Sequence, residues 1–205
     1  MLDAYEAERQ PITEQVSQFA MNHARQMIKM KRAVPHNIEE PGPAGDALRA
    51  EVGQGAYDLN VQQFCCAGLN FGYFYAGSPI IAHEAEPPPA YSMGGFTPST
   101  VPGCRAPHFW LADGRSLYDA FGPGYTLLRL DATAGVTELA AAAQAREMPL
   151  AVLDVLASEV PPAYQHKLVL CRADQHVVWR GDSLPVEPAP LVARLCGDGF
   201  LHGAA

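Results

Sequence analysis

The pattern of apolar and polar residues predicts a long amphipathic helix at the start of the chain. Over residues 2–32, one helical face carries Ile12, Val16, Phe19, Ala20, His23 and Met27. Pro11 interrupts this pattern, so we expect a kink or a new helix there. A Pro/Gly-rich connection over residues 34–45 is expected to be a flexible or exposed loop, and residues 46–51 are expected to form a short second helix.

Residues 56–82 are rich in aromatic residues and glycine, and the alternation from Phe71 to Tyr75 predicts a strand. Two interpretations are open for this aromatic group: it lines a pocket for an aromatic substrate, or it packs on the first helix. Packing is the favoured interpretation for the whole set, Phe64, Phe71, Tyr73, Phe74 and Tyr75. The prolines of residues 83–102 predict an extended connector.

The second half of the chain is more regular. Its first 31 residues predict, in order, a strand, a tight turn at Asp113-Gly114, a short amphipathic piece, a turn at 122–124 and an apolar strand at 125–130. The elements expected after these are a helix at 136–147, a strand at 150–156, a helical turn within 157–164, a hairpin of strands 167–171 and 177–180, and a helix at 190–196.

The order β-α-β-β-β-α is that of thioredoxin-like folds. The sequence therefore predicts an α/β protein with a thioredoxin-like domain over residues 101–205, built on a central mixed sheet flanked by helices. A helical and irregular section over residues 1–100 is expected to precede it.

Composition narrows the classes of partner. The formal net charge is −8, which argues against a surface that binds nucleic acid. The one basic run, residues 29–32, closes the first helix, where cations are favoured. No apolar run approaches the roughly 20 residues that cross a membrane, and the first ten residues lack the apolar stretch of a signal peptide. The five cysteines agree with a reducing compartment, so a cytoplasmic protein is expected.

The turn after the 125–130 strand, where thioredoxin-like folds place their chemistry, holds no cysteine. Its residues 131–135 offer Asp131 and Thr133 instead, either of which is expected to cap the following helix. No CxxC motif occurs, so the domain is expected to be redox-inactive. The adjacent Cys65 and Cys66 are expected to be small buried or half-buried residues, and packing roles are expected for Cys104, Cys171 and Cys196.

Other candidate residues predict structural roles. The seven histidines show no HxxxH or HExxH spacing, so no metal ligand is assigned. His108 is expected to orient a loop through a hydrogen bond, while Arg105 is expected to form an ion pair with Asp113, Asp119 or Asp182 rather than an anion site. The triplet 180–182 is expected to be a turn at a strand end. No hydrolase context surrounds the serines Ser92, Ser99 and Ser116.

Three stretches carry a resemblance to a known family. They are LDAYEAERQPI (2–12), PGCRAPHFWLADGRSLYDAFG (102–122) and LVLCRADQHVVWRGD (168–182). Through them, the chain resembles the C-terminal part of FAD-dependent aromatic hydroxylases, the phenol and para-hydroxybenzoate hydroxylase-like flavin monooxygenases. In that family the first stretch follows the last flavin-binding motif, and the other two belong to a thioredoxin-like C-terminal domain.

The resemblance implies a parent enzyme that hydroxylates an aromatic compound with FAD, NAD(P)H and O2. The family's flavin motifs, GxGxxG, DG and GD, are absent here, so no catalytic, cofactor-binding or metal residue is assigned in this chain. We therefore expect a C-terminal fragment with a structural or oligomerisation role that is inactive alone. Its missing partner is expected to be a flavin domain, and the fragment is expected to self-associate through its apolar helix face. The alternative is a stand-alone thioredoxin-like interaction module without redox activity.

Overall fold

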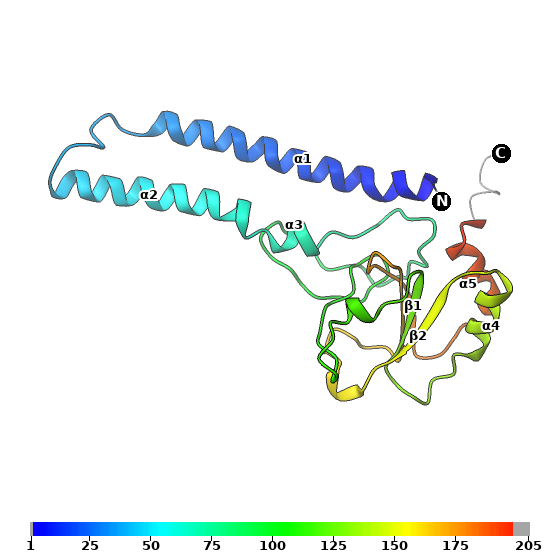
Figure 1. Cartoon of the computed structure of the whole chain (residues 1–205). Coiled ribbons are helices and arrows are strands. Elements are labelled where there is room, and N and C mark those ends of the chain that lie inside the picture. The colour runs from blue at the N-terminus through cyan, green and yellow to red at the C-terminus, as the bar shows by residue number, and fades with distance from the viewer. Residues whose placement is uncertain (1, 199–205) are drawn as a thin grey trace.

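The computed structural model describes residues 2–198 and shows an α/β fold with a helical arm (Figure 1). The arm begins with α1 (Leu2–Ala33), which is followed by α2 (Pro43–Phe64) running back beside it. The short helix α3 (Ala67–Phe71) then leads to the sheet-containing part. Residues 199–205, with which the predicted second domain ends, lie outside the described residues.

The first helix is one element, so a new helix beginning at Pro11 is wrong. Pro11 lies inside α1, where it removes the hydrogen bond to the carbonyl of Ala7. Ala7 is exposed, so water can satisfy that carbonyl. The basic residues Lys31 and Arg32 lie in the last turn of α1, as predicted. None of the helices within residues 2–198 has the length and hydropathy needed to cross a membrane.

Two predictions for residues 46–75 are wrong. The second helix extends from Pro43 to Phe64 instead of covering residues 46–51. No strand forms at 71–75, because Phe71 ends α3 and only Phe74 makes an isolated bridge, to Cys104. The proline-rich stretch 83–102 contains no helix or strand, in agreement with the predicted connector.

A four-stranded mixed sheet of order β2-β1-β3-β4 forms the second part. Its strands are β1 (Tyr125–Arg129), β2 (Leu150–Asp154), β3 (Leu168–Cys171) and β4 (Val177–Gly181). Strands β1 and β2 are parallel, while β1–β3 and β3–β4 are antiparallel. The helices are α4 (Thr137–Ala145) and α5 (Pro188–Leu195), with single 3-10 turns at Tyr118–Ala120 and Ala157–Glu159. The thioredoxin-like order is thus confirmed, with the 157–159 turn in place of its middle helix.

The sheet is buried on both faces because its apolar side chains alternate. In β1, Leu127 packs with α4 and α5 on one face, and Leu128 packs with residues 106–121 on the other. The segment 101–117 is held by isolated bridges instead of forming the predicted strand. The predicted turn after it is present: Gly114 has φ +82, and its N–H donates to the carbonyl of Leu111.

Candidate functional site

The turn between β1 and α4 occupies the place where thioredoxin-like folds carry their thiols. Asp131 Oδ1 accepts hydrogen bonds from the Thr133 N–H at 2.8 Å and the Thr133 hydroxyl at 2.6 Å. Lys167 Nζ lies 2.9 Å from Asp131 Oδ2. The hydrogen bonds from Thr133 and Lys167 hold the pKa of Asp131 well below its ordinary value. The predicted helix cap is wrong, because α4 begins after Val136 without a side-chain cap.

This turn does not fit an FAD pyrophosphate. In dinucleotide-binding folds, the equivalent turn of a parallel βαβ unit presents glycine N–H groups to phosphate at a helix N-terminus. Here the cavity of about 410 Å³ at the turn is lined by the carboxylates of Glu138 and Asp182, with Lys167 already paired to Asp131. No glycine of the turn has positive φ. The β1–α4 turn therefore supplies no site for the flavin pyrophosphate.

Two of the five thiols are buried in positions that keep them protonated. Burial raises the pKa of Cys104 to about 11, and it raises the pKa of the fully buried Cys171 as well. Both thiols are therefore protonated near neutral pH. Cys66 is buried as expected, but Cys65 is exposed, so its predicted burial is wrong. No group of three or more metal-ligating side chains occurs within residues 2–198.

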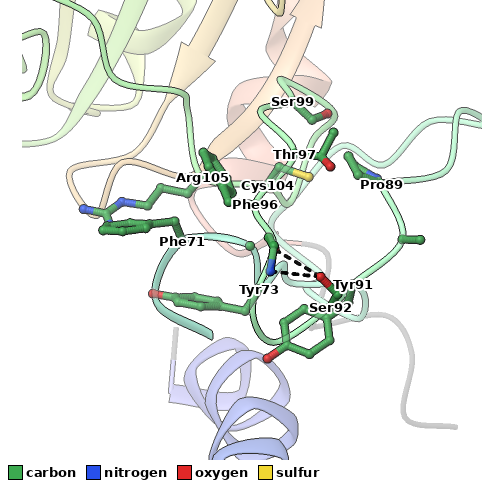
Figure 2. A pocket seen from close by; sticks show the side chains of 13 residues that line it. Phe71, Tyr73, Pro89, Tyr91, Ser92, Phe96, Thr97, Ser99, Cys104 and Arg105 are labelled. Atoms are coloured by element: carbon green, nitrogen blue, oxygen red, sulfur yellow. Dashed lines mark hydrogen bonds between the residues drawn. The ribbon is translucent and has the colours of Figure 1, made fainter. Parts of the chain in front are cut away.

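Arg105 does not form the predicted ion pair with Asp113, Asp119 or Asp182. Its Nε and Nη2 groups both donate to Oε1 of Gln175, with the Nε bond at 2.8 Å. The guanidinium carbon also lies 5.4 Å from the ring centre of Phe71 and 5.2 Å from that of Tyr118. Figure 2 shows the guanidinium over the Phe71 ring. The turn preceding β4 explains the difference, because it brings Gln175 to Arg105 before any carboxylate.

His108 orients its loop through a hydrogen bond, as predicted. Its Nε2 lies 2.9 Å from the hydroxyl of Ser116. The His108 ring also meets the rings of Trp110 and Tyr118 edge-on, at 5.0 and 5.1 Å between centres. These contacts fix the segment that carries Trp110, whose residue surface is 67% exposed.

The aromatic residues partly line a hollow, but it is too small for an aromatic substrate. It lies between α3 and the connector and includes Phe71, Tyr73, Tyr91 and Phe96 (Figure 2). Its volume is about 10 Å³, close to the room that one water needs. Of the predicted aromatic set, Phe64 is exposed, whereas Tyr75 is buried and receives Arg9 of α1 over its ring at 5.4 Å. Packing against the first helix is thus confirmed for Tyr75.

A buried polar cluster joins α1 to the β3–β4 hairpin, and no local sequence signal announces it. Arg172 donates to both carboxylate oxygens of Glu8, at 2.7 and 2.9 Å, although the two residues are 164 positions apart. Glu8 also accepts the hydroxyl of Ser78 at 2.5 Å, and Arg172 pairs with Asp174. Burial alone would raise the pKa of Asp174, but hydrogen bonds from His176 and Arg172 outweigh it and hold this pKa well below its ordinary value.

A second buried arginine fastens the connector to the sheet. The side chain of Arg180 is 3% exposed and pairs with both Glu84 and Glu86 of the connector. It also donates to the Thr100 hydroxyl at 3.1 Å. The predicted turn at 180–182 is wrong for Arg180 and Gly181, because both pair with β3 as the last two residues of β4. Both clusters hold the parts of the chain together, and Arg172 and Asp174 of the first also line a cavity of about 360 Å³ beside Tyr125.

Comparison with known proteins identifies the family. Residues 99–197 match the family described as aromatic-ring hydroxylase, C-terminal. The FAD-dependent monooxygenase apdD of Emericella nidulans is 31% identical over 194 residues, which cover 88% of this chain and 31% of that protein. The phenol 2-monooxygenase of a Pseudomonas species is 25% identical over 226 residues, covering 92% of this chain and 36% of that protein. The solved structure of the rebeccamycin biosynthetic enzyme RebC with reduced flavin has a TM-score of 0.84 at 35% identity, covering 96% of this chain and 36% of RebC.

These matches define a C-terminal thioredoxin-like unit of flavin hydroxylases. Residues 99–197 match the aromatic-ring hydroxylase C-terminal family, and over nearly its whole length the chain is similar to the C-terminal part of FAD-dependent monooxygenases. The resemblance carried by residues 2–12, 102–122 and 168–182 is confirmed. The chain spans about a third of the length of the relatives that it matches.

Proposed function

We propose that this chain serves as the structural C-terminal part of a flavin-dependent monooxygenase that hydroxylates an aromatic compound with NAD(P)H and O2. The observation that carries the proposal is the likeness to RebC, which extends over 96% of this chain at 35% identity and includes the helical arm. In this proposal the flavin is held by another part of the enzyme, on the same polypeptide or on a separate one, because the β1–α4 turn does not fit it.

The proposed role of the chain is to position elements rather than to react. Residues 1–100 form the section that meets the flavin-binding part, and residues 101–205 form the thioredoxin-like domain. The Glu8–Arg172 pair fixes the arm on that domain, and the Arg180 cluster fixes the connector. Self-association and a cytoplasmic location remain predictions. Ile12 packs against the sheet's core, whereas Val16 is 40% exposed, so the apolar face of α1 is only partly covered within the chain.

The alternative is a stand-alone interaction module with no enzyme attached. Bound flavin and enzymatic turnover distinguish the monooxygenase proposal from this alternative. A stand-alone module would show neither in any complex that contains this chain.

The genomic sequence preceding the Met1 codon, followed by purification of the polypeptide or complex that contains the chain, tests the proposal. We expect an in-frame or adjacent coding region with GxGxxG and GD motifs. The purified enzyme should carry flavin and consume NAD(P)H and O2 faster when an aromatic compound is present. A chain that purifies from its own cells with no flavin-binding region attached or bound would contradict the proposal.

A further inference from the structure

A continuous row of aromatic side chains crosses the surface from the connector to the segment before β1, with one guanidinium in its middle. Each ring or guanidinium carbon lies 5.0 to 6.0 Å from the next ring centre. We call this the aromatic row; its members, in order, are Phe96, Phe71, Arg105, Tyr118, His108 and Trp110. Figure 2 shows its first half, where Phe96, Phe71 and Arg105 gather beside the small hollow.

The guanidinium of Arg105, the cation in this row, has no carboxylate partner among the described residues. Among the described residues, five arginines are buried or half-buried, and four of them lie within 4 Å of a carboxylate: Arg9, Arg129, Arg172 and Arg180. Arg105 is the fifth, and its side-chain partner is the neutral amide oxygen of Gln175. A half-buried cation is stabilised by an opposite charge, and a guanidinium fork is suited to receive a carboxylate.

Arg105 is also held ready for such a partner. Gln175, which orients it, has φ +71, a left-handed conformation that is costly for a residue with a side chain. Arg105 is half-buried, and its recorded side-chain partners, Gln175 and the hydroxyl of Tyr118, are both uncharged. The row therefore presents a guanidinium group without a carboxylate between flat apolar faces.

The shape of the row favours a protein partner over a small molecule. Small ligands occupy concave sites, whereas the hollow beside Arg105 holds about 10 Å³. Phe96, Phe71 and Trp110 are 37%, 46% and 67% exposed. Exposed aromatic side chains around an arginine have the composition of the residues that dominate protein interfaces. A two-fold contact of this face with a second copy would bring two unpaired guanidinium groups together, which argues against self-association here.

We propose that the aromatic row is a docking surface for the flavin-binding part of the enzyme, and that Arg105 receives an aspartate or glutamate of that part. This inference rests on the proposed function. About two thirds of the length of RebC has no counterpart in this chain, so the flavin-binding part offers a large surface for contact. The aromatic row supplies apolar area and a positive charge without a carboxylate for that contact.

The test uses the purified enzyme that contains both this chain and the flavin-binding part. In the variant Arg105→Lys, a carbodiimide can join the introduced amine directly to a carboxylate in contact with it. The natural pair Lys167–Asp131, at 2.9 Å, is the internal positive control. Arg146→Lys is the matched variant, because Arg146 pairs with Asp198 inside this chain at 2.6 Å. Mass spectrometry of the digested product locates each crosslink.

We expect position 105 to crosslink to a carboxylate of the flavin-binding part and position 146 to crosslink to Asp198. Adding Trp110→Ala should lower the yield at position 105 about tenfold, because it removes an exposed anchor of the row. The inference is overturned if position 105 gives no crosslink while both controls do, or if it joins a carboxylate of this chain or of a second copy. An enzyme preparation without flavin would instead contradict the proposed function, and its visible spectrum shows this before any crosslinking.

Discussion

Removing the carboxylate of Glu8 should release the arm from the sheet-containing part. Glu8 is 5% exposed and Arg172 13%, and the two are joined by two hydrogen bonds of 2.7 and 2.9 Å. Breaking a buried pair by removing one partner costs about 3–5 kcal/mol. Arg172 keeps Asp174 as a second partner, so we expect Glu8→Ala to lower the free energy of unfolding by about 2–3 kcal/mol.

Two measurements check this value and its cause. For a chain of this length, a loss of that size lowers the melting temperature by about 5–10 °C. Hydrogen exchange should also quicken at the amides of residues 4–12, because local opening of α1 becomes easier. The matched control is Glu14→Ala, which removes an exposed carboxylate from the same helix. The reasoning is refuted if Glu8→Ala melts within about 0.5 kcal/mol of that control, or if exchange quickens elsewhere and not in α1.

Three further predictions concern the thiols, the glycines and the acid response. Ellman's reagent should react fast with Cys65 alone and slowly with the buried Cys104, and the chain should reduce no insulin; a rate lost on mutation of one cysteine contradicts this. Gly68→Ala should destabilise by about 1–3 kcal/mol, because its Cβ would meet the connector backbone, whereas Gly53→Ala in open space should stabilise by up to ~1 kcal/mol; equal melting shifts contradict this. Above the ordinary carboxyl pKa of about 3.9, the wild type should be more stable than Asp174→Asn. The difference should shrink as the pH falls further, because folding lowers the pKa of Asp174; a difference in urea midpoint that stays constant with pH contradicts this.

The regular half of the chain could be predicted from sequence because its signals are local. Leu127 and Leu128 belong to a short apolar run that can only be buried on both faces, and Pro149 lies shortly after α4, which ends at Ala145. The hairpin around residues 172–176 follows from two apolar runs with a polar turn between them. Each of these inferences needs fewer than about fifteen neighbouring residues.

The first half resisted prediction because packing overrides local preference there. Gly53 and Gly55 lower helix propensity, yet α2 continues through both to Phe64, well beyond the helix expected at 46–51. The aromatic alternation at 71–75 resembles that of a strand. However, Gly68 lets α3 approach the backbone of Ser92, and Phe71 is the last residue of that helix instead of the first of a strand.

The side-chain clusters were out of reach for a different reason. Glu8 and Arg172 are 164 residues apart, and Arg180 reaches back 96 residues to Glu84, so no spacing rule connects them. The available signal was indirect: Arg180 is a charged residue within a strand that is otherwise apolar and buried, which requires a partner somewhere. Arg105 shows the limit of predicting side-chain partners from sequence. Three aspartates were plausible partners, but in the structure Arg105 donates to the amide oxygen of Gln175.

The most direct test of the account is equilibrium dialysis of FAD against the purified 205-residue chain, alone and together with its flavin-binding part. We expect no stoichiometric flavin in the chain alone, because its β1–α4 turn presents carboxylates to a phosphate. It predicts one flavin for each complete enzyme, with oxidation of NAD(P)H stimulated by an aromatic compound. Stoichiometric FAD retained by the chain alone, or a complete enzyme that holds none, would contradict it.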